Sequence, residues 1–323
     1  MVDGGREPHR DASRAELETR RARRRAERRR RQVRRRRIVA LLALLGVVAA
    51  VVLVLGSAIG GGSTRAGKGS RGARRATAST AGAEGPVRNA TPQPDWEPHR
   101  GPVPILEYHV LGEAPPGTAY PELFVARPDF RHQLEWLDEN GYQAVTLEQV
   151  QDAWYRGGTL PPQPVVISFD DGYRPQFTFA LPQLRKHGWA GVLNLKAEGS
   201  DLYDSNVEAM LAAGWELAAH TIHHLDLTEL GPAELEEEVA GSRAILRREY
   251  GSPVKNFCYP GGRFDPTVIE AVEAAGYEGA TTEVRGYAEA GKPYELDRFE
   301  IVGATGVEGL AAALAEGESA AAG

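Results

Sequence analysis

Cysteine is nearly absent from this chain, which has one, Cys258, in 323 residues. A single thiol excludes an intramolecular disulfide and a zinc site built from several cysteines. Cys258 lies in a short apolar stretch, so we expect a small buried side chain. Histidine is missing after His224, and no Gly-x-Gly-x-x-Gly follows the first predicted strand. The second absence leaves a dinucleotide-binding fold without support.

Charge is distributed very unevenly along the sequence. Residues 1–37 contain 16 Arg and 6 acidic residues, a net charge of +10, and residues 60–100 contain 7 basic and 3 acidic residues, or +4. The totals of 38 basic and 44 acidic residues then leave 15 basic and 35 acidic residues elsewhere, or -20. An acidic globular part argues against nucleic acid as its partner.

Charged residues are absent between Arg37 and Arg65, and residues 38–59 are almost wholly Leu, Val, Ile, Ala and Gly. A stretch of about 20 such residues can cross a bilayer, whereas a signal-peptide core has about 7 to 15. We therefore predict a single-pass membrane anchor, with residues 1–37 as a cytoplasmic arginine-rich segment. A cleaved signal is the alternative. Residues 60–100 are rich in Gly, Ser, Ala, Thr and Pro and are predicted to be a flexible linker to an extracellular domain, 101–323.

From residue 102 the pattern alternates between strands and helices. The predicted strands are 103–108, 144–147, 165–169, 191–196, 216–219, 256–259, 280–283 and 299–302, and the helices include 129–140, 206–213, 232–250 and one from Asp265-Pro266 to Gly276. Such alternation implies parallel strands joined by right-handed crossovers. We predict an α/β fold, a distorted (β/α) barrel with fewer than eight complete units. An open doubly wound sheet would give the same pattern.

The triplet Asp170-Asp171-Gly172 ends the apolar run 165–169. Side chains alternate across a strand, so two adjacent carboxylates face one pocket only if the strand ends there and the backbone turns. One carboxylate could then hold a metal ion while the other takes a proton from water. An acidic, solvated turn would explain the triplet alone.

A second motif, His220-Thr221-Ile222-His223-His224, follows another strand-like stretch about fifty residues later. On one helical turn His220 and His224 would face the same side, whereas His223 would point elsewhere and be structural. With Asp171 they would give the three protein ligands typical of a catalytic zinc-like site. We expect zinc, with cobalt or nickel possible.

Ser-Phe-Asp-Asp-Gly followed by His-Thr-x-x-His resembles the polysaccharide deacetylases, the NodB homology domain of carbohydrate esterase family 4. The resemblance covers about Val103 to Gly303. It implies that Asp170 is the catalytic base and that Asp171, His220 and His224 bind the metal ion.

Two departures from the family pattern concern His109 and Arg298. No histidine is left for a C-terminal Leu-x-x-His motif, but Leu106-Glu107-Tyr108-His109 has this pattern at the start of the domain. That order resembles the circularly permuted branch, which includes the deacetylases of poly-N-acetylglucosamine, and implies that His109 is the general acid. The family's third motif, Arg-x-x-Pro-Tyr, appears as Phe257-Cys258-Tyr259-Pro260-Gly261-Gly262, without its arginine, and Arg298 is the candidate to orient the base.

The resemblance implies removal of N-acetyl groups from an N-acetylglucosamine-containing polysaccharide at the cell surface. Gly261 is the natural source of an oxyanion-binding N–H, beside Pro260 and Tyr259. Tyr173, like Tyr259, could stack on a sugar ring, although core packing is the commoner role of such residues. An esterase acting on acetylated xylan and a non-catalytic, membrane-tethered glycan-binding protein remain alternatives. We expect a polysaccharide substrate and a membrane contact, but no nucleic acid and no obligate protein partner.

Overall fold

The computed structural model describes residues 85–321, with side chains as far as residue 317. The predicted segments 1–37 and 38–59 and most of the predicted linker lie outside this range. Within 85–321, no helix combines the length and the apolar character that a bilayer crossing requires.

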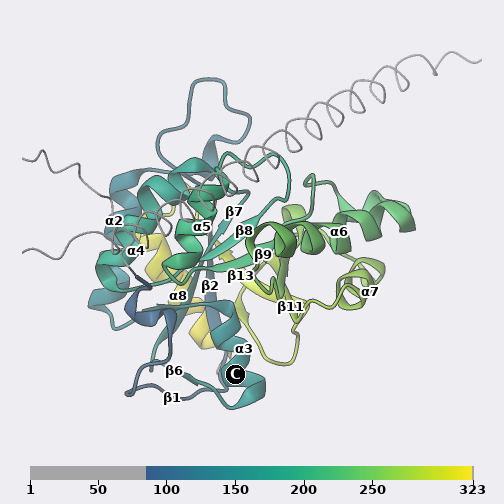
Figure 1. Ribbon diagram of the computed structural model, residues 1–323. Helices are drawn as coiled ribbons and strands as arrows, with labels where there is room; N and C mark the ends of the chain where they lie inside the picture. The colour runs from purple at the N-terminus through teal and green to yellow at the C-terminus, as the bar shows by residue number, and fades with distance from the viewer. Residues whose placement is uncertain (1–84, 322–323) are drawn as a thin grey trace, which may run out of the picture. The chain divides into compact units, whose positions relative to one another are not determined.

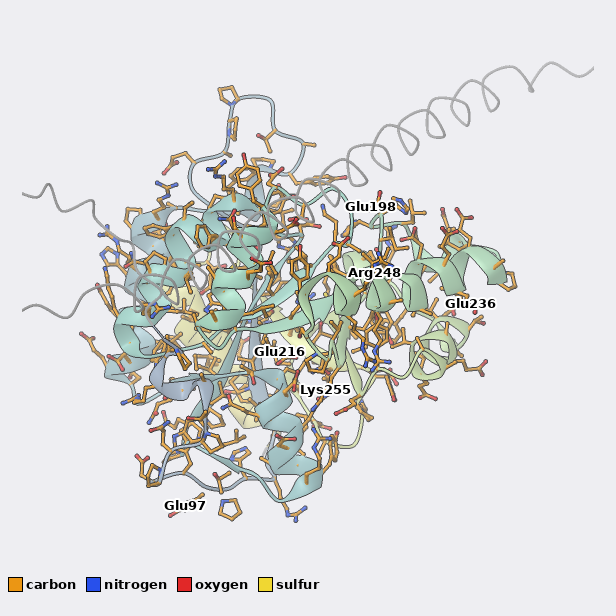
Figure 2. All side chains as sticks on the ribbon, in the orientation of Figure 1. Glu97, Glu198, Glu216, Glu236, Arg248 and Lys255 are labelled. Carbon is orange, nitrogen blue, oxygen red and sulfur yellow. The ribbon has the colours of Figure 1, made fainter. Side chains whose placement is uncertain are left out.

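Seven parallel strands form a closed barrel in the centre of this unit (Figure 1). They are β2 (Val103–Tyr108), β7 (Pro164–Asp170), β8 (Val192–Leu195), β9 (Glu216–Ala219), β10 (Asn256–Cys258), β11 (Gly279–Arg285) and β13 (Leu296–Glu300). Their order around the barrel is the order listed, and β13 pairs in parallel with β2 to close it. The prediction of a (β/α) barrel with fewer than eight units is confirmed.

Short strands extend the barrel at its margins. β5 (Gln143–Val145) pairs with the first half of β7, and β12 (Tyr287–Ala288) runs antiparallel to the start of β2. Two further pairs are β1 (Glu97–Pro98) with β6 (Thr159–Leu160) and β3 (Val110–Leu111) with β4 (Phe124–Val125). The small strands β1, β3, β4, β6 and β12 were not predicted.

Helices cover the outside of the barrel. They are α2 (Arg127–Glu139), α3 (Leu147–Arg156), α4 (Leu181–His187), α5 (Asp204–Ala212), α6 (Pro232–Tyr250), α7 (Pro266–Ala274) and α8 (Gly306–Ala321). Figure 1 shows α6 and α7 together on one side and α2 and α4 on the other. The α3 helix begins with a capping box of Thr146 and Gln149, which fixes where β5 ends.

The C-terminal part differs most from the prediction. The last barrel strand, β13, begins three residues earlier than the predicted strand 299–302, and this places Arg298 inside the barrel. The α8 helix was missed, because glycines in its interior weaken the helical signal. Gly317 has a tertiary reason: a Cβ there would lie 2.1 Å from the Tyr287 ring, so glycine lets α8 pack closely against β12.

Candidate active site

The side chains of the two sequence motifs meet at one end of the barrel. Asp170 is the last residue of β7, His109 and His220 directly follow β2 and β9, and Cys258 is the last residue of β10. Because all seven strands are parallel, these residues share the C-terminal end of the barrel, where barrel enzymes carry their catalytic groups.

Asp171 and Gly172 turn the chain sharply at the end of β7. Asp171 has φ 73° and Gly172 φ 78°, both in the left-handed region. Aspartate tolerates this conformation better than most residues, and it brings the second carboxylate round beside the first. A side chain at Gly172 would collide with Ser200, since a Cβ would lie 2.4 Å from Ser200 Oγ. The predicted backbone turn is therefore present and requires glycine.

The side chains of Asp171, His220 and His224 converge. Asp171 Oδ1 lies 4.0 Å from His220 Nε2 and 3.8 Å from His224 Nε2. The two imidazole rings meet edge to face, with centroids 4.7 Å apart. The predicted helical turn is wrong, however: residues 220–224 form a non-helical loop after β9, with positive φ at Thr221 (62°) and His224 (59°). Backbone turns, and not helical periodicity, bring the two rings together.

His220 is held in the form that a metal ion requires. Its Nδ1 lies 2.8 Å from the carbonyl oxygen of Cys258, so Nδ1 carries the proton and the Nε2 lone pair faces Asp171. Burial lowers the pKa of His220 to about 4, which keeps the ring neutral at neutral pH.

His223 points away from this group, as predicted. Its backbone N–H and that of Ile222 donate to Glu238 Oε2 at 2.8 and 3.0 Å, and its Nδ1 bonds Glu238 Oε1. Hydrogen bonds with Glu198 and Glu238 raise the pKa of His223 to about 9. The buried Glu238 of α6 therefore anchors the loop that carries the two other histidines.

Asp170 is buried and is held from three sides. Arg298 Nη1 donates to both of its oxygens at 3.0 Å, Asn194 Nδ2 donates to Oδ1 at 2.6 Å, and Cys258 Sγ lies 3.3 Å from Oδ2. Burial would raise the pKa of Asp170, but the charge of Arg298 and the hydrogen bond from Asn194 lower it overall. The arginine missing from the third motif thus has a spatial replacement on β13.

Glu107 is the site residue that the sequence reasoning missed. It is fully buried, its Oε2 lies 3.1 Å from Arg298 Nη2, and its Oε1 lies 3.7 Å from His109 Nε2. Residues 107 and 109 are two apart along β2 and its extension, so the period of a strand places both on one face. That alternation, applied to an acidic residue in an otherwise apolar strand, could have identified Glu107.

The segment after β10 provides the remaining candidates. Gly261 and Gly262 both have left-handed φ values, 58° and 61°, and a Cβ at Gly262 would lie 2.7 Å from the backbone nitrogen of Glu283. The Tyr259 ring is buried, its hydroxyl donates to the carbonyl oxygen of Tyr294, and its N–H donates to that of Thr281. Tyr259 therefore packs in the core and does not stack on a sugar. Tyr173 is half-buried beside Asp171, and Pro260 is buried.

The donor set of Asp171, His220 and His224 fits a divalent ion such as zinc. Donor atoms bound at about 2.0–2.1 Å in a tetrahedral site lie roughly 3.3 Å apart, so the 4.0 and 3.8 Å distances from Asp171 Oδ1 to the two Nε2 atoms need to shorten by about 0.5–0.7 Å. Asp171 Oδ1 is buried, and among the described residues no hydrogen-bond donor is aligned with it. Glu107, His109 and Asp170 also lie close together, but Arg298 already supplies the positive charge there.

Comparison with known proteins agrees with this geometry. Residues 157–280 match the family described as polysaccharide deacetylase. The chain is 29% identical over 204 residues to the putative polysaccharide deacetylase YxkH of Bacillus subtilis, covering 62% of this chain and 71% of that protein. It is 38% identical over 95 residues to the poly-beta-1,6-N-acetyl-D-glucosamine N-deacetylase of Escherichia coli, covering 29% of this chain but 14% of that enzyme.

Among solved structures, the deacetylase PplD of Streptococcus pyogenes in complex with acetate has the same fold. Its TM-score is 0.62 at 24% identity, over 67% of this chain and 99% of that one. The motifs and the barrel thus agree with the match of residues 157–280 to the polysaccharide deacetylase family.

Proposed function

We propose that this chain is a metal-dependent hydrolase that removes N-acetyl groups from a polysaccharide containing N-acetylglucosamine. The observation that carries the proposal is the position of Asp170. It lies between the metal-binding set on one side and His109 on the other, within 4.8 Å of a donor atom of His220 and of His109. The names of the similar B. subtilis and E. coli proteins support the substrate class.

In this mechanism the metal ion held by Asp171, His220 and His224 would polarise the acetyl carbonyl and increase the acidity of the attacking water. Asp170 accepts the proton of that water. Because Arg298 and Asn194 fix both of its oxygens, Asp170 is ionised and oriented before the substrate arrives. The N–H of Gly261, at the rim of β10, is our candidate donor to the developing oxyanion.

His109 donates a proton to the leaving amine. An amide needs this help because an amine anion is a poor leaving group. Glu107 lies beside the imidazole, with its carboxyl group buried and its Oε1 3.7 Å from His109 Nε2. Arg298 bridges Asp170 and Glu107, so one buried cation contacts both the base and the residue beside the acid.

The test is acetate release from defined polymers by the full-length protein. Poly-β-1,6-N-acetylglucosamine, peptidoglycan and chitin-like oligomers are compared with acetylated xylan, with and without a chelator. The proposal expects release from at least one N-acetylated polymer, loss on chelation, and recovery on addition of zinc. Release from xylan alone would show an esterase. Binding of a polymer without any release would show a glycan-binding protein.

We also propose that the domain acts outside the cell, anchored by residues 38–59. The support is the uncharged stretch of the sequence and the arginine-rich segment that precedes it. Protease added to intact cells that lack an outer membrane is expected to cut the 60–100 linker and release active domain. Protection of the domain until the cells are lysed would show that this location is wrong.

A further inference from the structure

Lys196 directly follows β8 and lies beside Asp171, one of the three predicted metal ligands. Its Nζ is 2.9 Å from Asp171 Oδ1, and the Lys196 side chain is mostly buried. The same oxygen is the Asp171 atom that lies 3.8–4.0 Å from the two histidine Nε2 atoms. The lysine ammonium therefore contacts the oxygen that a metal ion would use.

We infer that Lys196 competes with the metal ion for Asp171 Oδ1 and so lowers the affinity of this site for divalent ions. The inference rests on the metal site of the proposed function. Lys196 belongs to neither of the two sequence motifs.

The atom of Asp171 that Lys196 contacts shows whether Lys196 competes with the metal ion or supports its binding. A residue that supports a metal ligand contacts the atom that does not bind the metal, as the Cys258 carbonyl does at His220 Nδ1. Lys196 instead contacts the presumed coordinating oxygen. The ammonium lies 2.9 Å from Oδ1, so it and a metal ion would need the same atom of Asp171.

Electrostatic repulsion also predicts that Lys196 lowers the affinity of the site for a metal ion. With the metal ion absent, Lys196 neutralises the buried carboxylate of Asp171. With a divalent ion at the site, two cations would share one oxygen atom and repel each other. The ammonium then has a place to move to, because the face of the Tyr173 ring lies 5.8 Å from Nζ.

The experiment measures metal affinity and not catalysis. Full-length wild-type protein and the Lys196→Met variant are titrated with Co²⁺, followed by its visible absorption, and with Zn²⁺ in competition with a chelating dye. Loss of a supporting residue weakens metal binding by about 10- to 100-fold. Loss of a competitor should instead strengthen metal binding. We expect Lys196→Met to bind both ions about 10- to 100-fold more tightly than wild type, a change as large as the loss of a supporting residue causes but in the opposite direction.

Two control variants make the result specific. Lys196→Arg keeps the charge and should stay within about threefold of wild type, well inside the change expected for Lys196→Met. Lys186→Met removes the same charge from an exposed position on α4, where Lys186 bonds Gln183, and should leave affinity unchanged. Circular dichroism confirms that each variant is folded.

The outcomes separate this inference from the proposed function. Equal or weaker binding by Lys196→Met, with wild type binding metal, overturns the role of Lys196 and leaves the proposed function standing. If neither wild type nor any variant binds Co²⁺ or Zn²⁺, the metal site itself is wrong, and the proposed function and the inference both fail.

Discussion

Removal of the Arg298 guanidinium should strongly destabilise the domain. Arg298 is fully buried and contacts two carboxylates that are buried themselves, Asp170 through Nη1 and Glu107 through Nη2. The Arg298→Met variant keeps an unbranched apolar side chain but leaves both acidic groups without a cation. Its effect therefore reports directly whether these charges are paired as the structure describes.

The expected size follows from the burial of all three groups. Removing one partner of a buried ion pair costs about 3–5 kcal/mol, because the remaining charge is neither solvated nor compensated. Typical domain stabilities are about 5–15 kcal/mol, so the loss is a large fraction of the total. For a domain of roughly 150–250 residues, each kcal/mol lowers Tm by about 2–4 °C, which gives a decrease of roughly 6–20 °C.

The assay is urea denaturation and thermal unfolding of the metal-free protein, with acetate release measured in parallel. Arg285→Met is the matched control, because Arg285 lies on the neighbouring strand β11 but pairs with Glu316 at the surface. A surface pair of this kind contributes less than about 1 kcal/mol. Adding Glu107→Gln to Arg298→Met removes one of the two buried acidic groups that are left without a cation and should recover part of the stability, but not the activity.

A loss below about 1 kcal/mol in Arg298→Met, equal to that of the surface control, would refute the reasoning. So would full acetate release by the variant, because Asp170 would then need no cation to orient it.

Three further predictions test the site. His109→Ala should reduce turnover on an N-acetylated substrate by about 10²–10⁴-fold without loss of metal, and by much less on an activated aryl acetate; near-normal amide turnover would exclude His109 as the acid. Chelation should abolish activity but keep the fold, and in metal titrations His224→Ala should bind far more weakly than His223→Ala. The raised pKa of His223, about 9 against an ordinary 6.5, means that its pairing with Glu198 and Glu238 stabilises the fold fully below pH 6.5 and that this stabilisation is lost as the pH rises through 9. Glu238→Gln should therefore be less stable than wild type by about 1–2 kcal/mol at pH 6, allowing for solvent screening, and the two unfolding free energies should converge by pH 10.

The barrel was predictable from the sequence because its strands are short apolar runs separated by helices with clear ends. The Thr146–Gln149 capping box and the Gly188 and Gly251 C-caps are local signals, each decided by a few neighbouring residues. The α8 helix and the start of β13 were not predictable in this way. Their positions depend on packing between residues far apart in the chain, as with Gly317 against Tyr287.

The sequence predicted which residues form the metal site, but not the backbone conformation or the contacts that hold them. Asp-Asp-Gly and His-x-x-x-His indicate a metal site wherever the chain brings them together, and the structure does bring these side chains together. The sequence could not show that the histidines lie in a loop stabilised by Glu238, because spacing of four residues is equally typical of a helix. Nor could it show what Glu107 and Lys196 contact, because those contacts depend on strands distant in sequence.

Strand register explains why a histidine from the first strand can stand beside the base. β2 pairs in parallel with β7, with Tyr108 opposite Phe169, so the next residues, His109 and Asp170, are neighbours. Asn194 lies opposite Asp170 on the other side for the same reason. In a closed barrel the first and last strands are adjacent, as β2 and β13 are here, and a functional group can therefore move from one end of the sequence to the other with little change in space. The absence of histidine after residue 224 thus leaves the arrangement of groups intact, because the barrel places His109 next to β13 and β7 at once.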